Sequence, residues 1–454
     1  MRHGETMRYL TTTAAQRRTM LETIGADDIE ALLERIPGKA RLGRELTIPP
    51  ALAEGELIRH LAGLAGENAH TDAYVSFLGA GAYDHYAPSM INHMLLRSEY
   101  FTAYTPYQPE ASQGTLRTIY EYQTMVCELT GMDVANASLY DGGSALAEAA
   151  LMAHSATERE EVVVSGAVSP LARRVMATYS EGPRLPIRVL PWTDDGVTDL
   201  DRLRKVVSKK TACVMAQYPN FFGCLEDLEA QARIAHAAGA LFVVSVDPIA
   251  LALLRPPGEV GADLVVGEGQ GLGSPLNFGG PYLGLFACRK ELVRRMPGRL
   301  VGATLDSQGR RGFVLTLQTR EQHIRREKAT SNICTNVALV ALGATIYLAL
   351  LGKERFRKAA TLSTAKAHYA AEVLGKIPGV TPRFGAPFFK EFALRLPKSP
   401  DRLLRALRKK RILGGVALGQ FDRGLRDSIL VAVTERRTRA EIDAYALALA
   451  ALVA

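Results

Sequence analysis

The stretch that decides the fold is Thr211–Pro248, TACVMAQYPNFFGCLEDLEAQARIAHAAGALFVVSVDP. Its two ends are apolar runs, TACVMAQYP and LFVVSV, of the kind found in strands buried on both faces. Between them, DLEAQARIAHAAG has the residue pattern of a helix. A strand, a helix and a second strand in this order predict two parallel strands joined by a crossover helix.

The same alternation continues on both sides of this stretch. Further strands are predicted at VANASLY, EVVVS, IRVL, ADLVVGE and YLGLFAC, and helices at SALAEAALMAHSA, LARRVMATYS and DLDRLRKVV. The pattern predicts an α/β fold whose mainly parallel sheet is covered on both faces. A long helical stretch from Asn336 to about Ile377 is followed by a β-α-β-β-α order, which predicts a smaller C-terminal α+β domain. We therefore expect a helical arm (1–75), a large domain (76–330), and linking helices with a small domain (331–454).

Composition limits the possible functions. The 454 residues are 47% hydrophobic and 22% charged, as in ordinary globular proteins. The longest apolar run, residues 336–352, is shorter than the ~20 residues of a bilayer span and predicts a buried helix, so we expect no membrane partner. Five scattered cysteines without a CxxC pair predict reduced thiols, and the nine histidines show no metal-ligand spacing. No apolar signal segment is visible at the N-terminus, and we expect a cytoplasmic protein.

The net charge of +8, from 55 basic and 47 acidic residues, raises the question of nucleic-acid binding. The basic residues are spread along the chain in small clusters, without a stripe in which aromatic residues alternate with basic ones. We therefore expect no nucleic-acid partner. A modestly basic surface suits the attraction of an acidic protein instead.

Two segments at predicted strand ends each allow two interpretations. In DGGSALAEAALMA (Asp141–Ala153), a glycine pair and Ser144 open a helix, whose N-terminus could bind a phosphate or form only a capped turn. Asp247 ends an apolar strand, where an aspartate could pair with a pyridinium nitrogen or only start a turn before Pro248.

Three other segments have unusual composition. The glycines of ADLVVGEGQGLGSPLNFGGPYLG lack the dinucleotide spacing, so this is a glycine-rich loop rather than a nicotinamide site. REQHIRREKATSNICTN could be a solvated helix end capped by Ser331 or Asn332, or a source of phosphate donors. The long, mostly irregular stretch 76–113 is rich in Gly, Pro and Tyr, which is typical of a functional segment.

Together these segments resemble the P-protein of the glycine cleavage system, glycine dehydrogenase (decarboxylating). The likeness extends from about Met7 to the C-terminus and is closest to the alpha-type subunit (subunit 1) of P-proteins that are split into two chains. Its most specific stretches are SEYFTAYTPYQPEASQGTLRTIYEYQT, VVGEGQGLGSPLNFGGPYLG and REQHIRREKATSNICTN. The resemblance implies the fold-type I architecture of enzymes that use pyridoxal phosphate (PLP). It also implies decarboxylation of glycine and transfer of the aminomethyl group to the lipoyl arm of H-protein.

One departure from the family pattern defines the role that we expect. In the PLP-bearing half of the family, a His-Lys pair follows the strand that corresponds to ADLVVGE. The resemblance places Gln270 and Gly271 of this chain at the positions of that pair. No lysine occurs between Lys210 and Lys290. Because no nearby amine can form the internal Schiff base, we expect no covalently bound PLP, no certain catalytic residue in this chain, and a structural role for Asp247 and Ser144.

The resemblance further suggests that this chain completes the site of a PLP-bearing partner subunit, as αβ or α2β2. Our hypothesis is that Thr330, Ser331 and Asn332 reach the partner's cofactor phosphate. The substrate channel would be lined by Tyr83, His85, Tyr86, Tyr104, Thr105, Tyr107, Gln108, Glu110 and Gln113. Three alternatives remain: the loops only join the two chains, the chain is a PLP lyase or transferase that uses another lysine, or it is a structural or regulatory pseudo-enzyme.

Overall fold

The structure is a computed structural model that describes residues 11–44 and 46–454. The chain divides into two compact units, Met1–Asn68 and Ala69–Ala454, which we describe separately. The first unit contains the helices α1 (Ala14–Ile24), α2 (Ile29–Leu33) and α3 (Glu54–Gly66). Thr13 and Gln16 form a capping box at the start of α1, and Gly25 ends it in the left-handed conformation. These helices lie within the arm expected at 1–75.

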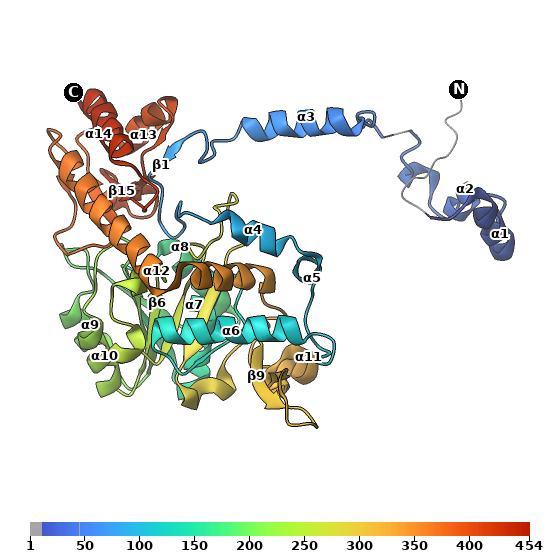
Figure 1. The fold of residues 1–454 in the computed structure, drawn as a ribbon, viewed down its shortest axis with the longest axis horizontal. Helices are drawn as coiled ribbons and strands as arrows, with labels where there is room; N and C mark the ends of the chain where they lie inside the picture. The colour runs from blue at the N-terminus through green and yellow to red at the C-terminus, as the bar shows by residue number, and fades with distance from the viewer. Residues whose placement is uncertain (1–10, 45) are drawn as a thin grey trace. The chain divides into compact units, whose positions relative to one another are not determined.

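The second unit is built on a seven-stranded sheet (Figure 1). Its strand order is β2-β8-β7-β6-β5-β3-β4. The five strands from β7 to β4 are parallel, while β8 is antiparallel to both of its neighbours. The mainly parallel sheet predicted from the sequence is therefore confirmed. The strands are β2 (Val134–Ala135), β3 (Glu161–Ser165), β4 (Ile187–Leu190), β5 (Thr211–Tyr218), β6 (Leu241–Val246), β7 (Leu264–Glu268) and β8 (Gly284–Cys288).

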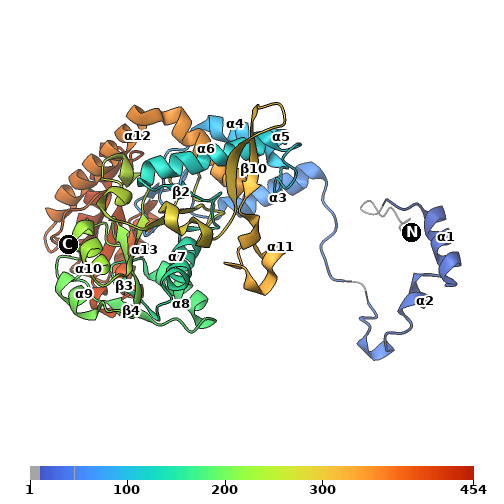
Figure 2. The same cartoon turned by 90° about the horizontal axis from the view of Figure 1, so that it is seen from below.

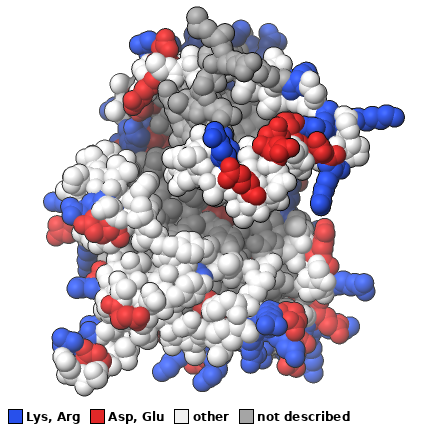
Figure 3. Space-filling model, turned by 90° about the vertical axis from the view of Figure 1, so that its right-hand side faces the viewer, with Lys and Arg blue, Asp and Glu red and all other residues white. Residues whose placement is uncertain are grey.

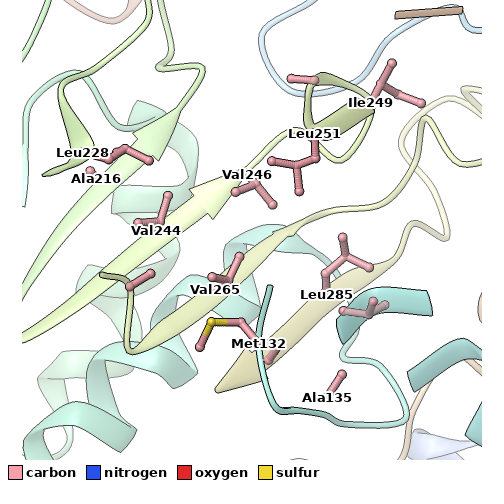
Figure 4. Close-up of a cluster of buried hydrophobic side chains, with 14 of the residues drawn as sticks. Met132, Ala135, Ala216, Leu228, Val244, Val246, Ile249, Leu251, Val265 and Leu285 are labelled. Carbon is pink, nitrogen blue, oxygen red and sulfur yellow. The ribbon is translucent and has the colours of Figure 1, made fainter. Parts of the chain in front are cut away.

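Both faces of the sheet are buried because alternate residues of each strand point to opposite sides. In β5, Val214 and Ala216 belong to one apolar cluster, whereas Met215 belongs to the other. The first cluster packs against α6, α9, α10 and α12, and the second against α7 and α8. Figure 2 shows α6 and α12 on the opposite side of the strands from α7 and α8. Figure 4 shows Val244, Val265 and Leu285 projecting from neighbouring strands into the first cluster.

The helices of the large sheet lie close to their predicted positions: α6 (Gln113–Thr130), α7 (Gly142–Thr157), α8 (Pro170–Glu181), α9 (Leu200–Val206) and α10 (Leu228–Ala237). Their ends have clear local causes. Asp141 caps α7 and Asp227 caps α10, each accepting a backbone N–H of the first turn. Gly131 ends α6 in the left-handed conformation, as the sequence predicts.

The long helix expected after residue 336 is α12 (Ala338–Gly375), which is kinked at Gly352. It leads to a four-stranded antiparallel sheet with the order β11-β12-β15-β14. The strands are β11 (Thr381–Pro382), β12 (Glu391–Arg395), β14 (Val416–Ala417) and β15 (Ser428–Ala432), with the helices α13 (Pro400–Lys409) and α14 (Arg439–Val453). The predicted β-α-β-β-α order corresponds to β12, α13, β14, β15 and α14. The boundaries proposed at 75/76 and 330/331 stay predictions.

Several elements were not predicted. The hairpin of β9 (Leu300–Leu305) and β10 (Arg311–Thr316) is half exposed and lacks a continuous apolar run. The stretch 76–113, expected to be mostly irregular, contains two short helices, α4 (Ser89–Leu95) and α5 (Ser98–Phe101). The remaining elements are α11 (Gln322–Arg325) and a parallel pair of β1 (Val75–Ser76) with β13 (Ile412–Leu413). On the face shown in Figure 3, basic and acidic side chains are interspersed.

Candidate functional site

A pocket of about 800 Å³ lies at the carboxyl ends of β5, β6 and β7. Its walls include Asp247 after β6, Glu268 at the end of β7, and the glycine pair that opens α7. The C-terminal sheet contributes Lys390 and Glu391 at the start of β12. Ligands of open α/β folds usually bind at this edge of the sheet, so this is the candidate site.

A buried lysine occupies the centre of the site. The side chain of Lys390 is 2% exposed, and its Nζ lies 2.6 Å from Asp247 Oδ2. The same Nζ is 2.7 Å from His85 Nε2 and 3.7 Å from the centroid of the Tyr83 ring. A carboxylate, a ring nitrogen and an aromatic face thus surround the ammonium group, which has three protons to donate.

His85 connects this lysine to a second carboxylate. Its Nδ1 is 2.6 Å from Glu435 Oε2, while the backbone N–H of Tyr86 donates to Glu435 Oε1 at 2.6 Å. An ammonium group can only donate, so His85 Nε2 accepts and its ring proton lies on Nδ1, facing Glu435. Burial acts to raise the pKa of Glu435, but the hydrogen bonds from His85 and Tyr86 lower it to about 2.

Glu391 and Tyr83 form a hydrogen-bonded pair beside the lysine. The Tyr83 hydroxyl donates to Glu391 Oε2 at 2.8 Å, and the Ala80 N–H donates to Oε1 at 2.6 Å. Burial raises the pKa of Glu391 to about 7 and is also the main cause of the raised pKa of Tyr83. Burial thus favours the protonated form of Glu391.

Two carboxyl groups cover the N-terminus of α7. Asp141 Oδ1 accepts the Ser144 N–H at 2.7 Å, and Glu268 Oε2 accepts the Gly142 N–H at 2.9 Å. Glu268 Oε1 also accepts the N–H groups of Gln270 and Leu283, at 2.9 and 3.0 Å. Burial raises the pKa of Glu268 to about 7, although these three backbone amides act in the opposite direction. The Gly142 and Ser144 N–H groups, which could favour a phosphate, therefore already have partners within the chain.

Gln270 and Gly271, which we expected at the place of a His-Lys pair, follow Glu268 of this pocket in the chain. Gln270 is buried and accepts the Tyr83 N–H at 2.8 Å through Oε1, while its Nε2 donates to the Tyr83 carbonyl at 3.0 Å. A Cβ on Gly271 would lie 3.0 Å from His85 Cδ2. Gln270 thus positions Tyr83, and the space in front of Gly271 is occupied by His85.

The nine residues expected in a substrate channel divide into two groups. Tyr83 and His85 make the contacts described above within this chain. Tyr86, Tyr104, Tyr107, Gln108, Glu110 and Gln113 are exposed, and Thr105 is half-buried. Some exposed members are nevertheless held in place: the Tyr107 hydroxyl accepts from Arg299 Nη2 at 2.9 Å, and Gln113 exchanges hydrogen bonds with the Phe313 backbone of β10.

The segment expected to reach a phosphate also has exposed members. Thr330 and Asn332 are exposed, whereas Ser331 is half-buried. The Ser331 hydroxyl accepts the Ile333 N–H at 3.0 Å. Burial raises the pKa of Glu148 on α7 to about 7, and a side-chain hydrogen bond between Ser331 and Glu148 acts in the opposite direction. The two exposed side chains are the ones available to a neighbouring molecule.

The sequence interpretation missed the buried Lys390, Glu391 and Glu435. Within FFKEFALRL, a Lys-Glu pair interrupts an otherwise apolar strand, and this was the available signal, because buried charges need partners. Two further findings concern the described residues alone. No three His, Cys, Asp or Glu side chains among them are grouped as a metal site would require. None of their helices is both long and apolar enough to cross a membrane.

The comparisons with known proteins agree on one family. Residues 7–449 match the family model of the glycine cleavage system P-protein. The chain is 53% identical over 448 residues to the probable glycine dehydrogenase (decarboxylating) subunit 1 of Moorella thermoacetica, covering 99% of this chain and 100% of that one. It is also 53% identical to the protein of that name from Carboxydothermus hydrogenoformans, covering 96% and 98%.

Solved structures show the fold. A crystal structure of glycine decarboxylase (P-protein) of the glycine cleavage system, in inhibitor-bound form, matches with a TM-score of 0.89 and 43% identity, covering 98% of this chain and 99% of that one. The glutamate decarboxylase of Lactobacillus brevis matches with a TM-score of 0.69 at 12% identity, covering 90% and 94%, which concerns the fold alone. The expected fold-type I architecture is confirmed, and the chain belongs to the glycine cleavage system P-protein family.

Proposed function

We propose that this chain is the subunit without a cofactor lysine in a two-chain glycine dehydrogenase (decarboxylating). With a PLP-bearing subunit it would decarboxylate glycine and transfer the aminomethyl group to the lipoyl arm of H-protein. Bound in the partner, PLP supplies the electron sink for the carbanion that remains when CO2 leaves. This chain would contribute surfaces that complete the partner's site and keep water out of it.

The observation that carries the proposal is the composition of the chain's own pocket. The resemblance puts Gly271 at the position of the lysine in the family's PLP-bearing half, and in the structure His85 lies against Gly271. The fold and the sequence of the family are thus present over the whole chain, while the amine that the chemistry needs is missing at its place. A chain of this kind can serve the reaction through a partner's cofactor.

Exposed polar and aromatic residues support a contact with that partner. Tyr104 is 76% exposed and Tyr107 50%, although aromatic side chains of this size are usually covered. Thr330 and Asn332 are exposed as well. We propose that the 104–113 loop lines the entrance to the partner's site and that 330–332 approaches its cofactor phosphate, with Tyr83, His85 and Tyr86 behind them.

Reconstitution tests the proposal most directly. Each chain is assayed alone, and then the mixture, for exchange of the glycine carboxyl group with labelled bicarbonate. Inactive single chains and an active mixture are expected. A partner that is fully active alone would contradict the proposal and would favour the structural or regulatory alternative. Size measurements on the mixture would separate αβ from α2β2.

The contribution of 330–332 requires a separate experiment. In the reconstituted complex, Thr330→Ala and Asn332→Ala are expected to weaken PLP binding and lower turnover, because each removes an exposed hydrogen-bond donor. Thr361→Ala, which removes an exposed hydroxyl on α12, is the matched control. If both variants retain the affinity and turnover of the control, the segment only joins the chains.

A second candidate, a PLP lyase or transferase in its own right, is raised by Lys390 in the pocket. A Schiff-base lysine must reach the aldehyde carbon of PLP, which lies on the opposite side of the ring from its nitrogen. The ammonium of Lys390 instead lies 2.6 Å from Asp247, the residue type that pairs with that nitrogen. An aldimine absorbance band in the isolated chain would favour this candidate.

We propose a cytoplasmic location, which suits the unpaired thiols of all five cysteines.

A further inference from the structure

The pocket of this chain contains both of the anchors that a PLP site uses, and each already has a partner. PLP is charged at two ends, a pyridinium nitrogen that pairs with an aspartate and a phosphate that binds at a helix N-terminus. Asp247 and the glycine-rich start of α7 offer these two partners at the edge of the sheet. With a volume of about 800 Å³, the pocket is large enough for a cofactor.

At the first anchor, an ammonium group takes the position of the pyridinium. Lys390 Nζ lies 2.6 Å from Asp247 Oδ2, within a side chain that is 2% exposed. His85 and the ring of Tyr83 complete its surroundings. The cation is buried and fully partnered, so a pyridinium could reach Asp247 only if the lysine left.

At the second anchor, a carboxyl group takes the position of the phosphate. Glu268 Oε2 accepts the Gly142 N–H at 2.9 Å, and Asp141 accepts the Ser144 N–H at 2.7 Å. Glu268 cannot easily turn away, because its other oxygen accepts two more backbone N–H groups. At the Gly142 and Ser144 N–H groups, a phosphate would meet carboxyl oxygens instead of open donors.

We propose that Lys390 and Glu268 replace the two charged ends of PLP, so that this chain's pocket is closed to the cofactor by its own side chains rather than only by the missing lysine. Lys390 is the principal barrier, because it occupies the carboxylate of Asp247, which directly follows β6. Removal of Lys390 opens the pyridinium end of the site, while Glu268 still occupies the phosphate end. The inference concerns this chain alone and stands whether or not a partner completes another site.

Pyridoxamine 5′-phosphate is the suitable probe, because without an aldehyde it cannot form Schiff bases with surface lysines. The thermal midpoint of the full-length chain is measured as the ligand is titrated. We expect no shift for the natural sequence and a concentration-dependent rise for Lys390→Ala, since a ligand that binds only the folded state stabilises it. A shift in the natural sequence as large as in Lys390→Ala, or no shift in Lys390→Ala, would overturn the proposal.

A control variant and a control ligand separate the two anchors. Lys390→Ala with Asp247→Asn opens the same space but removes the pyridinium's partner, and its shift should be lost. Pyridoxamine without phosphate should bind Lys390→Ala about as well as the phosphorylated form. Addition of Glu268→Gln should then create a preference for the phosphorylated form, and no preference would refute the role of Glu268. If Lys390→Ala does not fold unaided, its refolding yield with and without the probe decides the first question in the same way.

Discussion

Replacement of Lys390 by methionine should destabilise the chain strongly, because it leaves the Asp247 carboxylate buried without its cation. Asp247 is only 14% exposed, and the Lys390 side chain is 2% exposed. Breaking a buried ion pair from one side typically costs about 3–5 kcal/mol. The lost contact with the Tyr83 ring, 3.7 Å away, is included in that range. We therefore expect Lys390→Met to lower the free energy of unfolding by about 3–5 kcal/mol.

A double-mutant cycle tests whether this loss comes from the pair. Asp247→Asn keeps the Oδ1 acceptor for the Ile249 N–H but removes the charge. Because Lys390 and Asp247 are in contact, the double variant should lose less stability than the two singles together, by about 1–3 kcal/mol. Urea unfolding followed by the fluorescence of the single tryptophan, Trp192, measures each free energy.

An exposed ion pair provides the control for this cycle. Lys376 and Glu372 on α12 are also 2.6 Å apart, but their side chains are 68% and 64% exposed. Lys376→Met should cost less than about 1 kcal/mol, because water screens such a pair. If Lys390→Met costs no more than this control, or if the two single losses simply add, then burial of the lysine does not have the energetic role described here.

Three further predictions concern other parts of the same unit. Folding raises the pKa of Glu268 from 4.5 to about 7, which corresponds to about 3 kcal/mol of stability from the protonated carboxyl group. This stabilisation is complete below pH 4.5 and is lost as the pH rises through 7. Thermal midpoints between pH 5 and 8 should therefore fall less in Glu268→Gln than in the natural sequence. Gly142→Ala should lower the free energy of unfolding in urea by about 1–3 kcal/mol, because its Cβ would lie 2.9–3.1 Å from atoms of Glu268. At the control position, the Cβ of Gly114→Ala would meet nothing within 4 Å, so this substitution should be neutral or stabilising. Equal losses of stability in the two variants would refute this packing argument. A thiol reagent should label the exposed Cys334 first and the three buried cysteines only on unfolding, and simultaneous labelling of all of them in the native chain would contradict the burial described.

The sequence predicted the strands of the large sheet well, because buried parallel strands appear as continuous apolar runs. It also placed Asp247 and the start of α7 at the ligand-binding edge, since both follow from the carboxyl ends of strands. The hairpin β9–β10 was missed, because its exposed strands lack such runs. Lys390 was missed for another reason: its partner His85 lies 305 positions away, and periodicity carries no information about contacts of that range.

The row of hydrogen-bonded side chains from Glu435 through His85 and Lys390 to Asp247 joins three distant parts of the chain: the segment before α4, the end of β6, and the C-terminal sheet. In an enzyme whose cofactor holds these parts together, the apo form lacks that connection. Here the connection consists of side chains that are synthesised with the chain itself. The three parts are therefore tied to one another by contacts that form as the chain folds.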